Sequence, residues 1–179
     1  MYLLPPDYPD DVIRIGFCRA RGIFSRAIEW FGAGYFSHVT TLLPGSKNVI
    51  DSRLHGGVRI RPISSLESDT IFWVDLICDS TSQRTHVIDS LKSQLGKPYD
   101  QIAIWDFVTG SIQRRNWRDT RSWFCDELAV WSWCTAGLRE WPLLPLTRID
   151  PGGSFLIAGQ GPRRLPHAFS VLKNRDHTR

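Results

Sequence analysis

The sequence lacks any long uninterrupted hydrophobic run. Its 179 residues are 42% hydrophobic and 22% charged, which is close to ordinary soluble usage. No stretch approaches the roughly 20 apolar residues that a membrane helix needs, and residues 1–7 do not combine a basic segment with an apolar one, as a secretory signal does. These absences predict a self-folding chain with no transmembrane segment and a cytoplasmic location; delivery outside the cell by a phage or a secretion system stays open.

Closely spaced cysteine pairs and a basic body are also lacking. The four cysteines, 18, 78, 125 and 134, contain no C-x-x-C pair, so neither a zinc ribbon nor a disulfide framework is indicated, and we expect reduced thiols with no metal or cofactor. Residues 160–179 hold five Lys or Arg against one Asp, which accounts for the whole formal charge of +4. The remaining chain is near neutral, which argues against a nucleic-acid partner.

Hydrophobic periodicity predicts an α+β domain. Alternating or apolar segments predict strands at 13–17, 37–43, 48–52, 57–63 and 71–77, the last of them central. Helical stripes and caps predict helices at 23–31, at 81–95 after Ser80 or Thr81, and from Ser122 to about residue 135. This order indicates helices packed on an antiparallel sheet. We expect one domain over 1–159 and a loose basic tail over 160–179.

Cys125 has the setting that most favours chemistry among the cysteines. If Ser122 caps its helix, Cys125 lies in the first turn, where free N–H groups and the helix dipole favour a thiolate and can hold an oxyanion. A packing role is the alternative, because cysteine is among the most buried residue types. Cys134 lies about two and a half turns further on, so it faces the other way and cannot share a site with Cys125.

His38 begins a predicted strand, which is a rigid mount for a general base. If the turn at 44–47 keeps Leu43 opposite Asn48, then Asp51 falls opposite Thr40 and lies diagonally across from His38. A carboxylate there could fix the imidazole tautomer and stabilise the imidazolium. Spacing alone is equally compatible with a surface aspartate after a turn. The other four histidines, 55, 86, 167 and 177, have no comparable setting.

Four segments together resemble one family of enzymes. They are Ser37-His38-Val39, residues 49–52 with 57–60, residues 95–100 with the sequence Leu-Gly-Lys-Pro-Tyr-Asp, and residues 123–128 with the sequence Trp-Phe-Cys-Asp-Glu-Leu. In this order, histidine before cysteine, they resemble the YiiX/YebB-like group of circularly permuted NlpC-type papain-like amidases, and more distantly lecithin-retinol acyltransferase. The chain departs from that pattern in having Asp51 for a commoner glutamate and Asp126 for a commoner serine.

The resemblance implies a papain-like antiparallel sheet or half-barrel with packed helices, and a cysteine hydrolase. Cys125 is then the nucleophile, His38 its base and Asp51 the third triad member, with Tyr99 and Ser37 as candidate substrate or oxyanion contacts. The implied substrate is an amide in a small peptide or peptidoglycan fragment. A lipid acyl-hydrolase or acyltransferase, and an idle cell-wall or lipid-binding module of a phage-like assembly, remain alternatives. Hydrolysis versus transfer and the oligomeric state stay open.

Two further features bear on the substrate. Tryptophans at 117, 123, 131, 133 and 141 surround the predicted nucleophile helix and could line a groove for an acyl chain or a sugar-peptide, or could be core anchors. Arginines at 114, 115, 118 and 121 precede that helix and could bind an anion, or could form a solvated loop.

Overall fold

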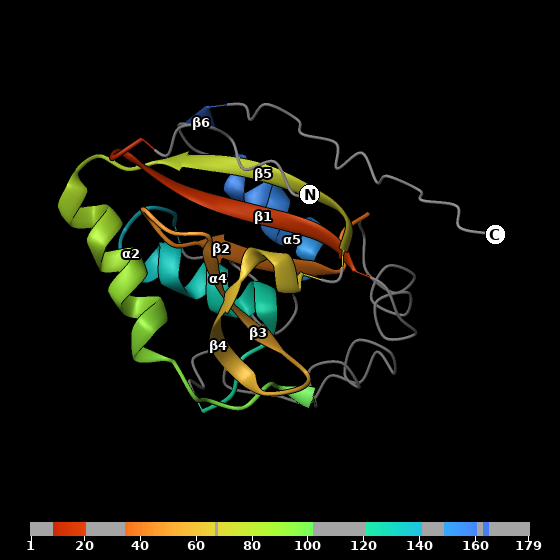
Figure 1. Ribbon diagram of the computed structural model, residues 1–179. Helices are drawn as coiled ribbons and strands as arrows, with labels where there is room; N and C mark the ends of the chain where they lie inside the picture. Colours follow the sequence, from red (N-terminus) through yellow and green to blue (C-terminus); the bar gives the residue numbers. More distant parts are fainter. Residues whose placement is uncertain are drawn as a thin grey trace.

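One open antiparallel sheet carries the fold. The computed structural model describes residues 9–20, 35–66, 68–101, 121–140, 149–160 and 163–164. Within these ranges, six strands lie in the order β4-β3-β2-β1-β5-β6, and all their pairings are antiparallel. Their bounds are β1 Val12–Ala20, β2 His38–Leu42, β3 Asn48–Arg53, β4 Gly57–Pro62, β5 Ser68–Ile77 and β6 Arg163–Arg164 (Figure 1). The predicted α+β class is confirmed, and the sheet does not close into a barrel.

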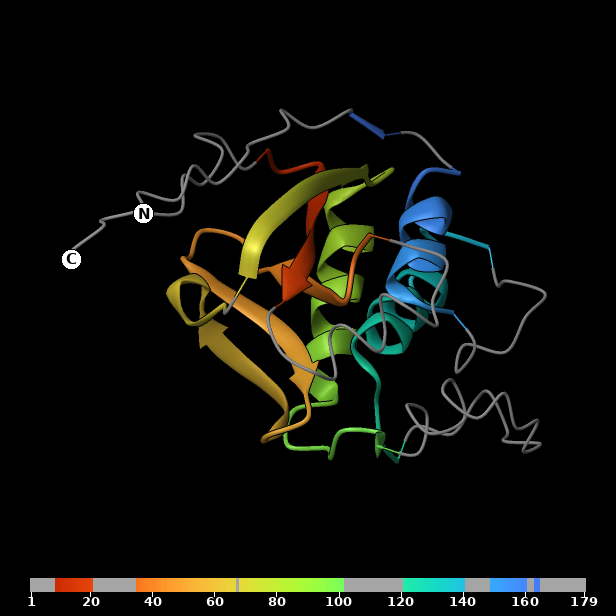
Figure 2. The same cartoon turned by 90° about the vertical axis from the view of Figure 1, so that its right-hand side faces the viewer.

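The α-helices of the described residues lie on one side of this sheet (Figure 2). They are α2 Thr81–Ser93, α4 Cys125–Thr135 and α5 Pro151–Ala158, and a short 3₁₀ helix, η1 Ile63–Ser65, follows β4. In the described part of the chain, no helix is both long and apolar enough to cross a membrane.

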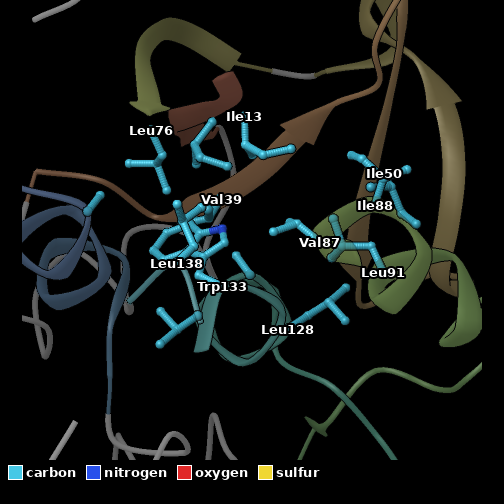
Figure 3. Packing of buried hydrophobic residues seen from close by; sticks show 14 of the residues in the cluster. Ile13, Val39, Ile50, Leu76, Val87, Ile88, Leu91, Leu128, Trp133 and Leu138 are labelled. Atoms are coloured by element: carbon cyan, nitrogen blue, oxygen red, sulfur yellow. The ribbon is translucent and has the colours of Figure 1, made fainter. Parts of the chain in front are cut away.

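The main core lies between the sheet and the helices. Val39 and Ile50 from the sheet belong to the same buried cluster as Leu91 of α2 and Leu128 and Trp133 of α4 (Figure 3). Side chains alternate between the two faces of a strand, and a second, smaller cluster gathers on the other face. Its members are Cys18, Leu42, Val49, Ile63, Leu66, Ile71 and Trp73. The same alternation assigns His38, Thr40 and Asp51 to that second face.

The N-cap of the helix that carries Cys125 lies two residues after the predicted cap, Ser122. Phe124 is the N-cap and Cys125 is the first helical residue. The delay has a cause, because residues just before the helix pair with another segment: Trp123 N–H donates to Pro98 O at 3.1 Å, and Asp100 N–H donates to Trp123 O at 3.1 Å. These bonds hold Trp123 extended beside Tyr99, so the helix cannot begin earlier.

Two further elements correct the sequence analysis. Helix α5 lies where the sequence analysis predicted no element; Asp150 accepts a hydrogen bond from Gly153 N–H and Pro151 occupies the first turn, which is a helix-start pattern. The tail that was expected to be loose contributes β6, which pairs with β5. The helix predicted at 23–31 lies outside the described residues, and the division at residue 159 stays a prediction.

Gly57 fixes the position of the linker, residues 96–98, that precedes α4. Val58 N–H donates to Lys97 O at 2.9 Å, and Gly96 N–H donates to Val58 O at 3.0 Å. Gly57 has a φ of +61°, and a Cβ at this position would run into the Lys97 carbonyl. The edge strand β4 and the linker therefore approach each other closely only because residue 57 has no side chain.

Replacement of Gly57 by alanine should destabilise the fold more than the same change at Gly45. Both glycines have a positive φ, but a Cβ at Gly45 meets nothing within 4 Å. Gly45→Ala should therefore lower the free energy of unfolding by about 1 kcal/mol, the cost of a left-handed backbone with a side chain. Gly57→Ala adds a backbone clash and should lower it by about 3 kcal/mol. Urea unfolding of both variants measures the difference, and equal losses would contradict this account of Gly57.

Candidate active site

His38 and Asp51 lie where the register predicted. The structure pairs Thr41 with Ile50 and Leu42 with Val49, and this register continued along the strands sets Asp51 opposite Thr40. His38 Nε2 is 2.9 Å from Asp51 Oδ2, so an imidazole–carboxylate hydrogen bond joins β2 to β3. The predicted register is confirmed, while a catalytic role for the pair stays a prediction.

Asp51 has two further partners that the sequence analysis did not find. Arg53 Nε donates to Asp51 Oδ2 at 2.8 Å, and Arg61 Nε donates to Asp51 Oδ1 at 2.9 Å. The Asp51 side chain is 0% exposed, so the carboxylate exchanges its hydration for three cationic or hydrogen-bonding groups. Strand alternation could have predicted both contacts. Arg53 is two residues from Asp51 on β3, and Arg61 is two residues from Arg59, which is the β4 residue paired with Asp51, so all three side chains share one face.

These neighbours keep Asp51 ionised. Burial raises the pKa of the Asp51 carboxyl, but the hydrogen bond and charge of His38, with the charge and hydrogen bond of Arg53, outweigh it and lower the pKa to about 2. An ionised carboxylate only accepts hydrogen bonds, so His38 Nε2 must be the donor. In the neutral imidazole the proton is then on Nε2, and Nδ1 is left as an acceptor.

Cys125 is buried against the first residues of β2. Its exposed fraction is 2%, its sulfur interacts with the backbone N–H groups of Val39 and Asp126, and the thiol lies 3.7 Å from Asp126 Oδ1, to which it can donate. Burial raises the pKa of Cys125 well above its usual value, and the charges of Asp126 and Asp51 add to the rise. The thiolate expected at this helix start is therefore not favoured, because desolvation outweighs the N–H groups.

The structure does not join the thiol to the base. Within the described part of the chain, no hydrogen bond links Cys125 to His38; the thiol bonds instead to Asp126, and the imidazole bonds to Asp51. Val39 lies next to His38, its side chain packs in the main core, and its backbone contacts the sulfur. The two candidate groups thus lie on either side of one backbone segment, with His38 Nδ1 uncommitted.

Asp126 is a second buried carboxyl that the sequence analysis left without a role. It is 0% exposed, and among the residues that the structure describes its Oδ2 has no hydrogen-bond partner. Burial raises the pKa of Asp126 well above its usual value, and the charges of Glu127 and Asp150 raise it further. Burial thus disfavours the charged form of both Asp126 and the adjacent Cys125 thiol.

The two candidate oxyanion residues have different positions. The Tyr99 ring packs against Phe124 with centroids 5.5 Å apart. Burial and the charges of Cys125 and Asp126 raise the pKa of Tyr99 well above its usual value, so its hydroxyl is a neutral donor within electrostatic reach of the thiol. Ser37 is buried, and its backbone N–H donates to Cys18 O at 2.9 Å, which fixes the start of β2.

The tryptophans that the structure describes around α4 are core anchors. Trp123 is 1% exposed and Trp133 is 0% exposed, and the rings of Trp123 and Trp131 have centroids 4.9 Å apart. Positions 117 and 141, and the arginines at 114, 115 and 118, lie outside the described residues. Cysteines 18, 78, 125 and 134 are buried free thiols, and Cys134 bonds to Glu140 O instead of sharing the Cys125 environment.

The arrangement is an α+β fold in which a helix-start cysteine is set against a sheet that carries a histidine–carboxylate pair. Among solved structures, the chain is similar to the crystal structure of the metalloprotein YiiX from Escherichia coli O157:H7, with a TM-score of 0.52 and 20% identity over 70% of this chain and 66% of that one. The likeness shows a YiiX-like fold. No family profile and no curated protein match the sequence.

YiiX is described as a metalloprotein, whereas the described residues of this chain show no comparable group of metal ligands. No group of three or more His, Cys, Asp or Glu side chains in the described ranges is arranged to hold a metal ion. The His38–Asp51 pair also has two guanidinium groups on its carboxylate, and these repel a cation. We therefore derive no step through a metal.

Asp51 should make stability depend on pH in the acid range. Its folded pKa of about 2 lies below the ordinary value of 3.8, so ionised Asp51 stabilises the fold above about pH 4, and this contribution, roughly 2 kcal/mol, is lost as the pH falls toward 2. Urea midpoints from pH 5 to pH 2 should fall less steeply for Asp51→Asn than for wild type. Asp10→Asn, at a side chain 93% exposed, is the control, and parallel curves for wild type and Asp51→Asn would refute the assignment.

Proposed function

We propose that the chain is a thiol acyl hydrolase in which Cys125 is the nucleophile, His38 the general base and Asp51 the carboxylate that orients the base. The observation that carries the proposal is the hydrogen bond of 2.9 Å between His38 Nε2 and Asp51 Oδ2. It leaves Nδ1 as the basic nitrogen, on the strand whose next residue, Val39, contacts the Cys125 sulfur through its backbone.

The reaction follows from these groups. His38 Nδ1 takes the thiol proton as Cys125 Sγ attacks the substrate carbonyl carbon, and the carbonyl oxygen becomes an oxyanion. The N–H groups at the start of α4, together with the Tyr99 hydroxyl, are the donors proposed for that oxyanion. The imidazolium then returns its proton to the leaving amine, an acyl-enzyme forms, and a water molecule activated by Nδ1 releases the acid.

Burial of Cys125 determines how this step begins. Because burial raises the pKa of the Cys125 thiol, its ionisation before the substrate arrives is disfavoured, so proton transfer to His38 accompanies attack instead of preceding it. Asp51 stabilises the imidazolium that forms at that moment. The substrate must also bring Nδ1 and the sulfur together, because they share no hydrogen bond at rest in the described part of the chain.

The proposed substrate is an amide in a small peptide or peptidoglycan fragment. Support comes from the sequence resemblance to NlpC-type amidases and from the YiiX-like fold; a phospholipid or other lipid ester is the competing acyl substrate for the same thiol. The tryptophans Trp123 and Trp133, which would have favoured an acyl-chain groove, are buried core residues.

A second candidate function is that of an idle papain-like module that binds cell-wall or lipid ligands. Two observations favour it: Cys125 is 2% exposed, and its hydrogen-bond partner is Asp126 and not His38. An idle module needs neither an accessible nor an activated thiol, so product analysis separates the two functions.

Incubation with muropeptides should give Cys125-dependent cleavage. Mass spectrometry should detect new peptide products with wild type and none with Cys125→Ala, because removing the nucleophile leaves no acyl acceptor. Cys134→Ala should retain near-wild-type turnover, since this thiol bonds to Glu140 O away from the site. Cys125-dependent release of fatty acid from phospholipid vesicles, with muropeptides intact, would reassign the substrate; no turnover of either would favour the idle module.

Substitution of Asp51 should slow acylation, while Cys125 remains the attacking group. Asp51→Asn removes the negative charge that stabilises the imidazolium and should lower the acylation rate by about 10²- to 10⁴-fold. Asp51→Glu keeps the charge and should retain more activity than Asp51→Asn. Pre-steady-state kinetics on the most reactive substrate measure both, and wild-type acylation in Asp51→Asn would remove Asp51 from the triad.

A further inference from the structure

The two arginines on Asp51 have donors left over. Arg53 uses Nε on Asp51 and Nη1 on Ser65 O at 3.0 Å. Arg61 uses Nε on Asp51 and Nη2 on Gly57 O at 3.0 Å. Arg53 Nη2 and Arg61 Nη1 make no hydrogen bond in the part of the chain that the structure describes. Each guanidinium is thus fixed in place at two of its nitrogens, and the third is available.

Charge and exposure also favour an outside partner. Two guanidinium charges meet one carboxylate, and Asp51 is the only acidic residue of the β3–β4 hairpin, residues 48–62. The Arg53 and Arg61 side chains are 25% and 16% exposed, whereas Asp51 is 0% exposed. The carboxylate therefore lies beneath the arginines, and the excess positive charge lies at the edge that solvent reaches.

We propose that Arg53 and Arg61 bind an anionic group of the substrate, a carboxylate or a phosphate. Guanidinium groups suit such anions because their N–H donors form a planar fork, and fixed donors lose little conformational entropy on binding. Asp51 Oδ2 accepts from both Arg53 and His38, so the anion lies beside the base. Its use as a substrate subsite rests on the function proposed above, whereas anion binding itself does not.

A purely structural role for the arginines makes a different prediction. If Arg53 and Arg61 serve only to position Asp51, their loss would alter the His38–Asp51 pair. Added anions would then have no effect on the wild type or on the variants. The hairpin supplies a matched control in Arg59, which is exposed, makes no hydrogen bond to Asp51 in the described structure, and has its guanidinium over Gly56 at the turn.

NMR titration of the full chain tests the proposal without requiring turnover. The His38 ring signals would be followed during addition of N-acetylglutamate, glycerol 3-phosphate and the neutral control N-acetylglutamine. We expect saturable shifts with at least one of the two anions and none with the neutral amide. Arg53→Gln and Arg61→Gln should weaken the affinity for the anion by about tenfold or more. Arg59→Gln should change this affinity less than about twofold.

The titrations distinguish a peptide carboxylate from a phosphate as the source of the anion. They also test the anion site separately from the proposed hydrolase activity. Tighter binding of N-acetylglutamate indicates a peptide carboxylate, and tighter binding of glycerol 3-phosphate indicates a phosphorylated or lipid substrate. Cys125→Ala should bind the anion as wild type does, so loss of hydrolase activity and loss of the subsite remain distinguishable. If a glutamine variant does not fold, it is replaced by Arg61→Lys, which keeps the positive charge but places all its donors on one nitrogen and so loses the planar fork. Absent saturation, or equal affinity in wild type and the Arg53 and Arg61 variants, overturns the proposal.

Discussion

The site depends on one buried carboxylate. Asp51 is shared among His38, Arg53 and Arg61, which come from three strands or their ends. Removing any one partner leaves the others facing an altered charge, because buried ions are stable only when they are paired. The same carboxylate sets the imidazole tautomer and holds two guanidinium groups in place, so the base and the neighbouring positive charge are consequences of a single buried ion.

Cys125, the proposed nucleophile, has an opposite environment. A helix start usually favours a thiolate, yet Cys125 and the adjacent Asp126 are both nearly free of solvent contact, and desolvation dominates the pKa of each group. The part of the site around Asp51 is therefore ionic, whereas burial disfavours charge in the part around Cys125 and Asp126. A chemistry that transfers a proton between the two halves only when substrate is present suits this division, since an ion pair would be costly on the dry side.

The sequence predicted local geometry better than environment. Strand alternation and turn length gave the β2–β3 register and hence the His38–Asp51 bond. Burial depends on what packs above a residue, so the raised pKa of Cys125 and the core positions of Trp123 and Trp133 could not follow from spacing. Arg53 and Arg61 had the correct parity to meet Asp51, but surface arginine is the usual expectation. The α4 start moved because Trp123 bonds to a linker about 25 residues earlier.

The chain order of the site has a consequence for folding. The His38–Asp51 contact closes a separation of 13 residues and Arg61–Asp51 one of 10, whereas the Ser52–Trp123 bond that ties β3 to the nucleophile helix spans 71. Short loops close at lower entropic cost. During synthesis the charged half can thus assemble on its hairpin while the thiol is still inside the ribosome, so a chain stopped before residue 125 would present a complete imidazole–carboxylate pair with nothing to activate.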